Sequence, residues 1–199
     1  SIILLDRIED PVAAAFSLAF EQKFYVPCEE QGMLIEWTSF ENNTAKNGGA
    51  LAARDLQNTA VTIKDSQFDG NKATGSRGGA ILASGPDVGV SIERTTFTNN
   101  LAGKEGKVST PGSGGGVAIE NQVGLRMMNI SASHNSALGG GHGGFLFSER
   151  SSELFIKDGH IVDSTSSSGG GGGLAIFATR SVLDTVSVRR CSAGVDGGG

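Results

Sequence analysis

The chain has 199 residues, a formal net charge of −5, 31 glycines and only 19 % charged residues. It contains no block of Lys or Arg, which argues against nucleic-acid binding. It also contains no apolar run of the roughly 18 residues that a membrane-spanning helix needs. Glycine is enriched about twofold over its usual share of ~7 %, but without a Gly-X-Y period, which excludes collagen. Two cysteines are too few for a disulfide scaffold.

Residues 1–32 differ from the rest and predict a cap at the end of the fold. Asp10 followed by Pro11 is typical of a helix start. Apolar side chains then recur every four residues: Val12, Phe16, Phe20 and Phe24. This spacing predicts a short amphipathic helix over residues 11–24 that protects exposed strand edges. The alternative is an atypical strand-rich coil in which residues 1–5 form an edge strand, and the sequence leaves both open.

A repeat of about 29 residues fills residues 33–199. Each copy is anchored on one apolar position: Phe40, Phe68, Phe97, Ala132, Ile161 and Val188. Two apolar residues at alternate positions precede each anchor, from Met33 and Ile35 in the first copy to the degraded Ser181 and Leu183 in the last. A period of two indicates a strand with one buried face.

Asparagine and glycine complete the repeat. An asparagine lies three residues after the first four anchors: Asn43, Asn71, Asn100 and Asn135. A glycine pair then opens a second strand: Gly48 and Gly49, Gly78 and Gly79, Gly115 and Gly116, Gly143 and Gly144, Gly172 and Gly173. Each copy therefore holds two strands and a third short one. Because residues 197–199 start another glycine motif, we expect the repeats to continue beyond them.

This register predicts an all-β fold, a right-handed parallel β-helix of about six coils with one coil per repeat. Stacked coils would place the phenylalanines in an internal column and let each asparagine amide bond to the next. The glycine pairs would allow unusual backbone angles and close approach between coils. One outward column would alternate in charge: Glu36, Lys64, Glu93, Met128, Lys157 and Asp184.

The step from Phe97 to Ala132 is longer than the others and predicts a loop insertion. The extra residues are polar and rich in glycine, and loop closure becomes only slowly more costly with length, by about 0.6 kcal/mol per doubling. We therefore expect that shortening residues 104–110 leaves the fold intact. The insertion is also a first place to look for a partner contact.

The pairing of F-x-x-N with G-G-A-[ILV] resembles the repeat of the polymorphic outer-membrane proteins, a group of bacterial autotransporter adhesins. The segments "FENN…GGAL", "FDGN…GGAI" and "FTNN…GGVA" carry the resemblance, which fades where the anchors become Ala132, Ile161 and Val188. Similar repeats occur in large surface proteins of other microbes and of protists. The resemblance implies a β-helical passenger region exposed on a surface, which acts in adhesion or as a stalk. It carries over no catalytic residue.

Parallel β-helices also carry polysaccharide-cleaving sites, so an enzyme has to be considered. A lyase needs carboxylates for Ca²⁺ and a base, and a hydrolase needs two close carboxylates. The best outward candidates precede the anchors by three residues: Asp65, Arg94, Asn129 and Asp158. Asp65 and Asp158 would be three coils apart, about 14 Å, which is too far for paired carboxylates. We therefore expect no catalytic site.

The histidines and cysteines do not indicate a site either. His142 in "GHGG" resembles a histidine motif of polygalacturonases, but the Asp-Asp and Arg-x-Lys companions are missing. His134, His142 and His160 occupy different positions of the repeat, so we expect no metal site. Cys28 and Cys191 would lie at opposite ends of the stack and should not pair. We expect no cofactor.

The sequence favours a structural or adhesive module of a large extracellular or cell-surface protein, as part of a filament or stalk. Its expected partners are other subunits or further repeats of the same surface assembly, and glycans. Asn42 and Asn129 begin N-x-[ST] sequons and are glycosylation candidates in a secreted eukaryotic protein. The alternative is a β-helix that binds or cleaves carbohydrate, which rests on the fold alone.

Overall fold

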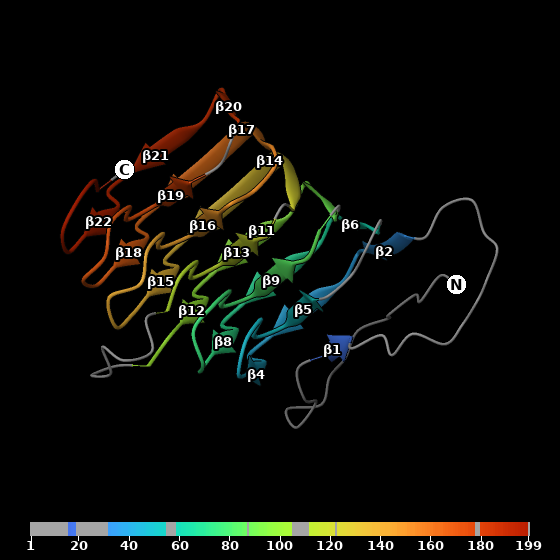
Figure 1. Ribbon diagram of the computed structural model, residues 1–199, viewed down its shortest axis with the longest axis horizontal. Coiled ribbons are helices and arrows are strands. Elements are labelled where there is room, and N and C mark those ends of the chain that lie inside the picture. Colours follow the sequence, from blue (N-terminus) through green and yellow to red (C-terminus); the bar gives the residue numbers. More distant parts are fainter. Residues whose placement is uncertain are drawn as a thin grey trace.

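The computed structural model describes residues 16–18, 32–54, 59–86, 88–104, 112–121, 123–177 and 180–198. In these ranges the regular secondary structure is entirely β-strand, and the strands form three parallel sheets around one hydrophobic core. Figure 1 shows the strands stacked from the β1 end to the β22 end, with successive coils lying side by side. The predicted fold, a parallel β-helix, is confirmed.

The three sheets follow one another around each coil. Sheet A has six strands: β1 (Phe16–Leu18), β5 (Leu51–Arg54), β9 (Ile81–Ser84), β13 (Val117–Glu120), β16 (Leu146–Glu149) and β19 (Leu174–Phe177). Sheet B has ten: β2 (Gly32–Glu36), β3 (Ser39–Glu41), β6 (Ala60–Lys64), β7 (Gln67–Asp69), β10 (Gly89–Glu93), β11 (Thr96–Thr98), β14 (Gly124–Ser133), β17 (Leu154–Val162), β20 (Ser181–Asp184) and β21 (Ser187–Arg189). Sheet C has six short strands: β4 (Thr44–Ala45), β8 (Lys72–Ala73), β12 (Leu101–Ala102), β15 (Ser136–Ala137), β18 (Thr165–Ser166) and β22 (Ser192–Ala193).

The pairing register is the one that the repeat predicts. Val61 lies between Met33 and Val90, and Phe68 lies between Phe40 and Phe97. Alternate residues of the inner sheet B strands, such as β6, β10 and β17, are buried, and they form the core together with inward residues of sheet A. Stacking equivalent residues at coil spacing therefore buries a continuous core that no single repeat could bury alone.

The phenylalanine column is present in the first three coils and then changes. The rings of Phe40 and Phe68 stack with centroids 4.7 Å apart, and those of Phe68 and Phe97 with centroids 5.1 Å apart. In the fourth coil the anchor is Ala132, and the ring of Phe145 lies 5.4 Å from Phe97 instead. Phe145 comes from the residue just before β16, so a side chain from another part of the coil fills the space above Phe97.

Asparagine side chains form a second internal column, at the turn between sheets B and C. The Oδ1 atom of Asn71 accepts hydrogen bonds from the backbone N–H and the amide of Asn43, at 3.1 and 2.9 Å. Its Nδ2 donates to the carbonyl of Phe40 at 2.9 Å and to Oδ1 of Asn100 at 3.0 Å. Asn100 repeats this pattern with Asn135. Asn71, Asn100 and Asn135 are fully buried, and the ladder satisfies the polar groups that burial would otherwise leave unpaired.

The two glycines of each pair have different roles. The first adopts a positive φ, 58° at Gly48 and 65° at Gly78, which favours glycine. The second lies so close to the next coil that a Cβ on Gly49 would meet the carbonyl oxygen of Gly79 and the amide of Lys72. Glycine is therefore required for both the bend and the spacing between coils.

Two glycine pairs lie one residue earlier than the sequence pattern placed them. Gly114 and Gly171 carry the positive φ of a first glycine, 65° and 68°. Pairing of Val117 with Ile81 and of Leu146 with Leu174 gives the same register. The equivalent pairs are thus residues 114–115 and 171–172 rather than 115–116 and 172–173. Longer glycine runs at both places hide the register, because every residue in the run fits the motif.

The corners of the coil are built from residues in the left-handed region. One corner divides sheet B and has φ between 46° and 57°: Trp37, Asp65, Arg94, Asn129, Asp158 and Thr185. The other leads towards sheet C and has φ between 50° and 64°: Asn42, Gly70, Asn99, His134, Asp163 and Arg190. Such angles are uncommon outside glycine and carry a cost. Their recurrence in every coil shows that the strands on either side determine the corner conformation.

The amino-terminal helix is not found where the structure can test it. Phe16–Leu18, which lie inside the helix expected over residues 11–24, form β1 and pair in parallel with Leu51–Ala53 of β5. An open strand edge on β5 offers backbone groups that a strand satisfies and a helix does not. The rest of residues 11–24 and residues 1–5 lie outside the described residues.

The longer sequence interval between the anchors of the third and fourth coils, Phe97 and Ala132, leaves the strand register unchanged. Before it, Leu101 pairs with Ser136, and after it, Val117 pairs with Ile81. The insertion therefore lies between β12 and β13, as the sequence predicts. Most of residues 104–110 lie outside the described residues, so their removal stays a prediction.

Candidate functional site

The outer face of sheet B is polar and arranged in columns. The column with predicted alternating charge is in register from Glu36 to Asp184. Lys64 Nζ lies 3.9 Å from Glu36, and Lys157 Nζ lies 3.6 Å from Asp184. Beside this column, the guanidinium of Arg126 lies 4.9 Å from the ring centroid of Phe155. Exposed pairs of this kind stabilise little, so the columns mainly define what the face presents to a partner.

Two corner positions carry bidentate ion pairs between successive coils. Arg94 donates two hydrogen bonds of 2.7 Å to the carboxylate of Asp65. Arg190 donates two to Asp163, at 2.7 and 2.8 Å. The hydrogen bonds from these guanidinium groups lower the pKa of both Asp65 and Asp163. All four groups lie at the surface, where they are available to solvent or to a partner.

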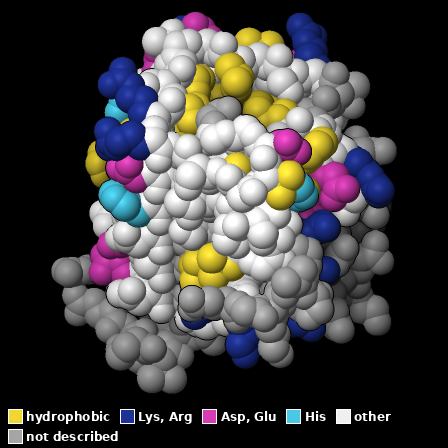
Figure 2. Space-filling model, turned by 90° about the vertical axis from the view of Figure 1, so that its left-hand side faces the viewer, with side chains coloured by type: hydrophobic (Ala, Val, Ile, Leu, Met, Phe, Trp, Pro, Cys, Tyr) yellow, Lys and Arg dark blue, Asp and Glu magenta, His cyan; other side chains and the backbone are white. Residues whose placement is uncertain are grey.

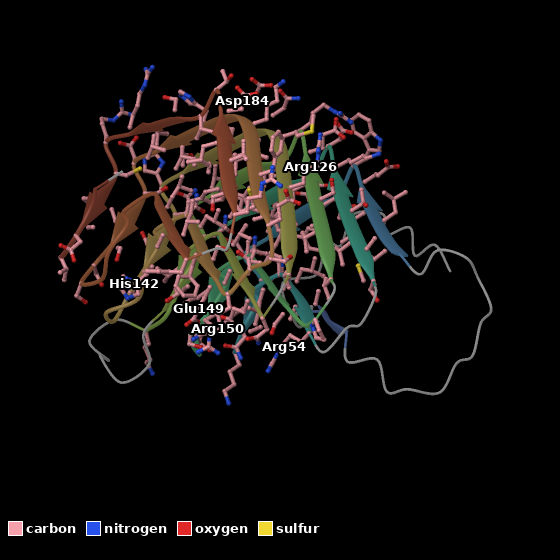
Figure 3. All side chains as sticks on the ribbon, turned by 45° about the horizontal axis from the view of Figure 1, so that its top comes forward. Arg54, Arg126, His142, Glu149, Arg150 and Asp184 are labelled. Atoms are coloured by element: carbon pink, nitrogen blue, oxygen red, sulfur yellow. The ribbon has the colours of Figure 1, made fainter. Side chains whose placement is uncertain are left out.

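The outer face of sheet A is different, because a buried apolar strip runs along it. Leu82, Ala118, Phe147 and Ala175 form a second hydrophobic cluster, separate from the core. Arg77 covers part of this strip, with its guanidinium 5.7 Å from the ring centroid of Phe147. Arg77 also forms an ion pair with the largely buried Glu120, and its Nη2 lies 3.7 Å from Glu149. Figure 3 shows Arg54, Glu149 and Arg150 on one side of the molecule, with Arg126 and Asp184 on the opposite side.

His142 joins this strip to the last strand of sheet A. Its ring centroid lies 6.3 Å from that of Phe147 and 6.1 Å from that of Phe177. Nδ1 of His142 accepts a hydrogen bond of 2.9 Å from the backbone N–H of Gly170. An accepting Nδ1 places the proton of a neutral imidazole on Nε2, which is then a donor. Phe177 keeps 58 % of its surface exposed.

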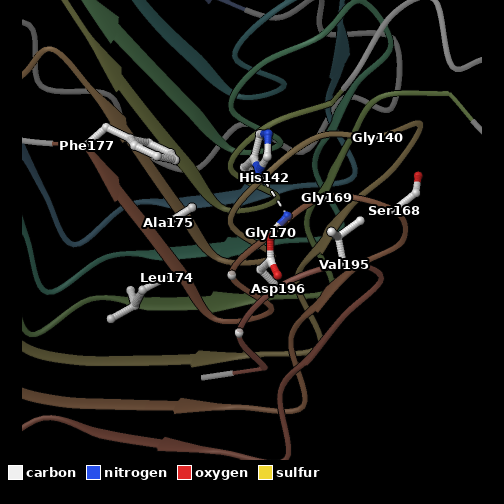
Figure 4. A pocket seen from close by; sticks show the side chains of 12 residues that line it. Gly140, His142, Ser168, Gly169, Gly170, Leu174, Ala175, Phe177, Val195 and Asp196 are labelled. Atoms are coloured by element: carbon white, nitrogen blue, oxygen red, sulfur yellow. Dashed lines mark hydrogen bonds between the residues drawn. The ribbon is translucent and has the colours of Figure 1, made fainter.

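A pocket of about 540 Å³ lies beside these residues. Its walls come from the glycine-rich turn around Gly170, from β19 and from the turn at Val195 and Asp196. Figure 4 shows the ring of Phe177 directed towards His142, with Asp196 beside Gly170. The pocket thus combines one exposed aromatic ring, one imidazole, one carboxylate and a strand edge.

The β22 end of the stack exposes apolar side chains. Five large hydrophobic residues are exposed in the described chain: Trp37, Phe177, Val182, Leu183 and Val195. All except Trp37 belong to the last strand of sheet A or to the coil that follows it. Figure 2 looks onto this end and shows hydrophobic side chains between backbone atoms, with charged groups near the rim. Among the exposed residues, Leu183 is the equivalent of the buried Ile156 in the preceding coil.

The polar residues singled out from the sequence do not converge in the structure. Asp65 and Asp158 lie in one corner column with Arg94 and Asn129 between them. His134 lies at a corner, His142 beside sheet A and His160 on β17. In the described ranges no three His, Cys, Asp or Glu side chains are placed to hold a metal ion. Among these residues there is also no helix long and apolar enough to cross a bilayer.

Asn42 and Asn129, the first residues of the two sequons, are exposed at corners. Cys191 is a half-buried free thiol that continues the asparagine column, and its Sγ donates to the carbonyl of Arg189 at 3.4 Å. Cys28 lies outside the described residues. The structure thus places both sequons where a modifying enzyme could reach them.

Sequence reasoning missed the cluster on sheet A. Arg77, Glu120 and Glu149 are far apart in sequence, and Arg77 reaches over the two coils that follow its own. The available signal was the recurrence of glutamate at the end of the second strand, in "GGVAIE" and "GFLFSE".

One known family of repeats matches part of the chain. The family model described as the Chlamydia polymorphic membrane protein repeat matches residues 38–54 and 65–84. These segments contain the phenylalanine, asparagine and glycine-pair positions of the first two coils, so the resemblance noted in the sequence is confirmed for this repeat type. No curated protein and no solved structure matches the chain.

Proposed function

We propose that the chain is a structural or adhesive β-helix module of a large extracellular or cell-surface protein, and that it does not act as an enzyme. The observation that carries the proposal is the pair of internal ladders: stacked phenylalanines join the first three coils, and hydrogen-bonded asparagines join the first four. The match to a repeat of polymorphic membrane proteins supports a surface location.

The geometry suits a spacer that presents its sides. The asparagine ladder is buried and fully bonded, so the shape of the rod does not depend on the outward residues. The outer columns of sheet B and the corners are polar and exposed or half-exposed, and can vary without disturbing the core. A rod of fixed shape with variable faces is suited to holding other domains away from a surface or to contacting a partner along its length.

Turnover assays test the proposal. The purified chain is incubated with a panel of acidic and neutral polysaccharides, with and without Ca²⁺, and new reducing ends and unsaturated products are measured. We expect none above background. As a matched control, the Glu120→Gln and Glu149→Gln variants are assayed beside the unchanged chain. Robust turnover that is lost in either variant would replace the proposal with an enzymatic role for the sheet A cluster.

A carbohydrate-binding module is the second candidate, and the half-exposed ring of Phe177 beside His142 favours it. Aromatic rings with adjacent hydrogen-bonding groups are common features of ligand sites. A glycan array probed with the chain and with Phe177→Ala separates the two candidates. Binding that disappears in the variant supports a carbohydrate site, and equal signals from both proteins count against it.

A further inference from the structure

The outer face of sheet B carries one arginine that is held in place without a carboxylate. Arg126 is an exposed residue of β14, in the middle of the stack. Its guanidinium lies over the ring of Phe155 in the next coil, 4.9 Å from the centroid, and its Nε donates to the Sδ of Met128 at 3.2 Å. These are the side-chain interactions of Arg126 with the described residues. Arg94 and Arg190, by contrast, each bind a carboxylate.

The carboxylates in the columns beside Arg126 are each engaged by another cation. The pairs are Glu93 with Arg94, Glu153 with Arg180, and Asp184 with Lys157. A carboxylate that is already paired gains little by turning towards Arg126, because exposed ion pairs stabilise little. The Nη1 and Nη2 donors of Arg126 are therefore available to an anion from another molecule.

The Phe155 ring fixes the plane of the Arg126 guanidinium. A guanidinium stacked on an aromatic ring keeps its N–H groups free at the edge of the plane. Because the side chain is already ordered by this contact, binding an anion costs less rotamer entropy than it would at an unsupported arginine. The planar fork matches a carboxylate, which it can bind through two parallel hydrogen bonds. Arg126 is thus arranged to receive a carboxylate.

The surface beside Arg126 is open and bears hydroxyl groups. Ser91 and Thr62 precede Arg126 in the same outward column, one coil apart, and both are half-buried. In the adjacent outward column Gly89 pairs with Gly124, and a Cβ on Gly89 would meet nothing within 4 Å. A ligand can therefore lie against the backbone at these glycines. The two hydroxyls beside it can each donate and accept a hydrogen bond.

We propose that Arg126, Phe155, Ser91, Thr62 and Gly89, which we call the Arg126 patch, bind an acidic saccharide. The carboxylate of the sugar binds the guanidinium, the sugar ring lies over Gly89, and the sugar hydroxyls bond to Ser91 and Thr62. A sugar acid suits the patch better than a densely charged polyanion, because paired carboxylates flank the patch and the chain has a net charge of −5. The proposal rests on the adhesive role given above and names its ligand class.

Calorimetric titration of the whole chain with three probes tests the site. Trigalacturonate carries carboxylates and ring hydroxyls, and its methyl ester keeps the hydroxyls but has no charge. A blocked tripeptide of aspartate has the same number of carboxylates and no sugar ring. Amide chemical shifts report where each probe lies. The variants are Arg126→Gln and, as a matched control, Arg150→Gln, which removes the same charge from an exposed position on the other side of the molecule (Figure 3).

We expect trigalacturonate to bind saturably and to shift amides in residues 89–91 and 124–126. Loss of the charge-assisted bonds should weaken binding at least about tenfold for the ester and for Arg126→Gln, and the tripeptide should bind as weakly. Arg150→Gln should bind like the unchanged chain, and Ser91→Ala roughly threefold more weakly.

Several outcomes would overturn the proposal. They are no binding of trigalacturonate, equal binding of the ester or the tripeptide, unchanged affinity in Arg126→Gln or Ser91→Ala, and shifts confined to other residues. Weaker binding in Arg150→Gln would also overturn it, because the affinity would then follow net charge rather than the patch. Failure here leaves the structural module intact, because the turnover assays test that separately.

Discussion

The first three coils and the last three fill the same cross-section with different residues. In the first three, a stacked phenylalanine, a hydrogen-bonded asparagine and a buried hydroxyl recur at fixed positions; the hydroxyls are Thr38, Ser66 and Thr95. Each hydroxyl donates to the carbonyl two residues earlier and closes the corner. In the later coils other residues replace the phenylalanine and the hydroxyl, and the asparagine persists only as Asn135 in the fourth coil. The strand register nevertheless continues to β20, β21 and β22.

The difference shows that coil geometry tolerates changes in individual columns when volume is conserved across the coil. Ala132 leaves room in the fourth coil, and Phe145 occupies it. Gly116 in the preceding coil makes this possible, because a Cβ at this position would lie 2.6 Å from the Phe145 ring. The repeat motif is therefore one solution among several for filling the core, and the backbone pairing is the part that every coil shares.

The largest expected effect comes from removing a core ring in either half. Phe68→Ala should lower the free energy of unfolding by about 3–5 kcal/mol, because it leaves a cavity between two stacked rings. Phe145→Ala should have a similar effect, although Phe145 lies outside the motif. Urea denaturation of both variants measures this. An unchanged midpoint for Phe145→Ala would mean that the fourth coil does not need the ring.

A second test of the comparison moves the phenylalanine ring of the fourth coil from position 145 back to the anchor position, 132. The double variant Ala132→Phe with Phe145→Ala restores the anchor residue of the first coils and should be more stable than either single variant. Ala132→Phe alone should be destabilised by overpacking, at about 1–3 kcal/mol. Simple addition of the two single losses would contradict the idea that both rings use the same space.

Breaking the asparagine ladder should have the next largest effect. Asn100→Ala removes the acceptor of the Asn71 backbone N–H and the side-chain donor to the carbonyl of Phe68, both of which lie in the buried ladder. We expect a loss of about 2–3 kcal/mol. Ser164→Ala, at the equivalent position of the fifth coil, should lose less than about 1 kcal/mol, because that hydroxyl bonds only to the carbonyl of Val162. Equal losses in thermal denaturation would show that the two halves do not differ here.

Gly116→Ala should destabilise the chain by about 1–2 kcal/mol, because the new Cβ would press on the ring of Phe145. The same change in a Phe145→Ala background should cost much less. A double-mutant cycle measured by urea denaturation gives the coupling between the two sites. Zero coupling would contradict the contact on which the comparison of the two halves depends.

The smallest effects are expected at the corner ion pairs. The Arg190 guanidinium lowers the pKa of Asp163 in the folded chain, and Arg94 does the same for Asp65. A lowered folded pKa gives stability that is present above the unfolded pKa and lost as pH falls through the folded value. Arg190→Ala and Arg94→Ala should each raise the pKa of the paired aspartate towards its ordinary value. Carbon-detected NMR titration of the two carboxyl groups checks this, and an unchanged pKa would mean that the pair is not formed in solution.

The sequence predicted the parts of the fold that local spacing controls. Alternating apolar residues at a fixed offset from Phe40, Phe68 and Phe97 gave the strands, their inward faces and the register between coils. It could not predict the direction of the Phe145 ring, which depends on Ala132 in the same coil and on Gly116 in the preceding coil. It also misplaced two glycine pairs, since runs of identical residues carry no register.

The candidate site was less predictable. Arg77 meets Glu120 and Glu149 only because the coils bring the outer ends of sheet A strands together, and Arg77 spans them from a turn. This contact is not recorded in the spacing of one repeat.

The close backbone approach at the glycine pairs has a consequence for how such chains change in length. Each coil meets its neighbours through the same glycine contacts and the same strand register, so a whole coil can be gained or lost without designing a new interface. A genetic duplication of about 29 residues would lengthen the rod by roughly 4.8 Å and leave both ends as they were. Unequal recombination could therefore change the length of the rod in equal steps, while the outward-facing residues diverge independently.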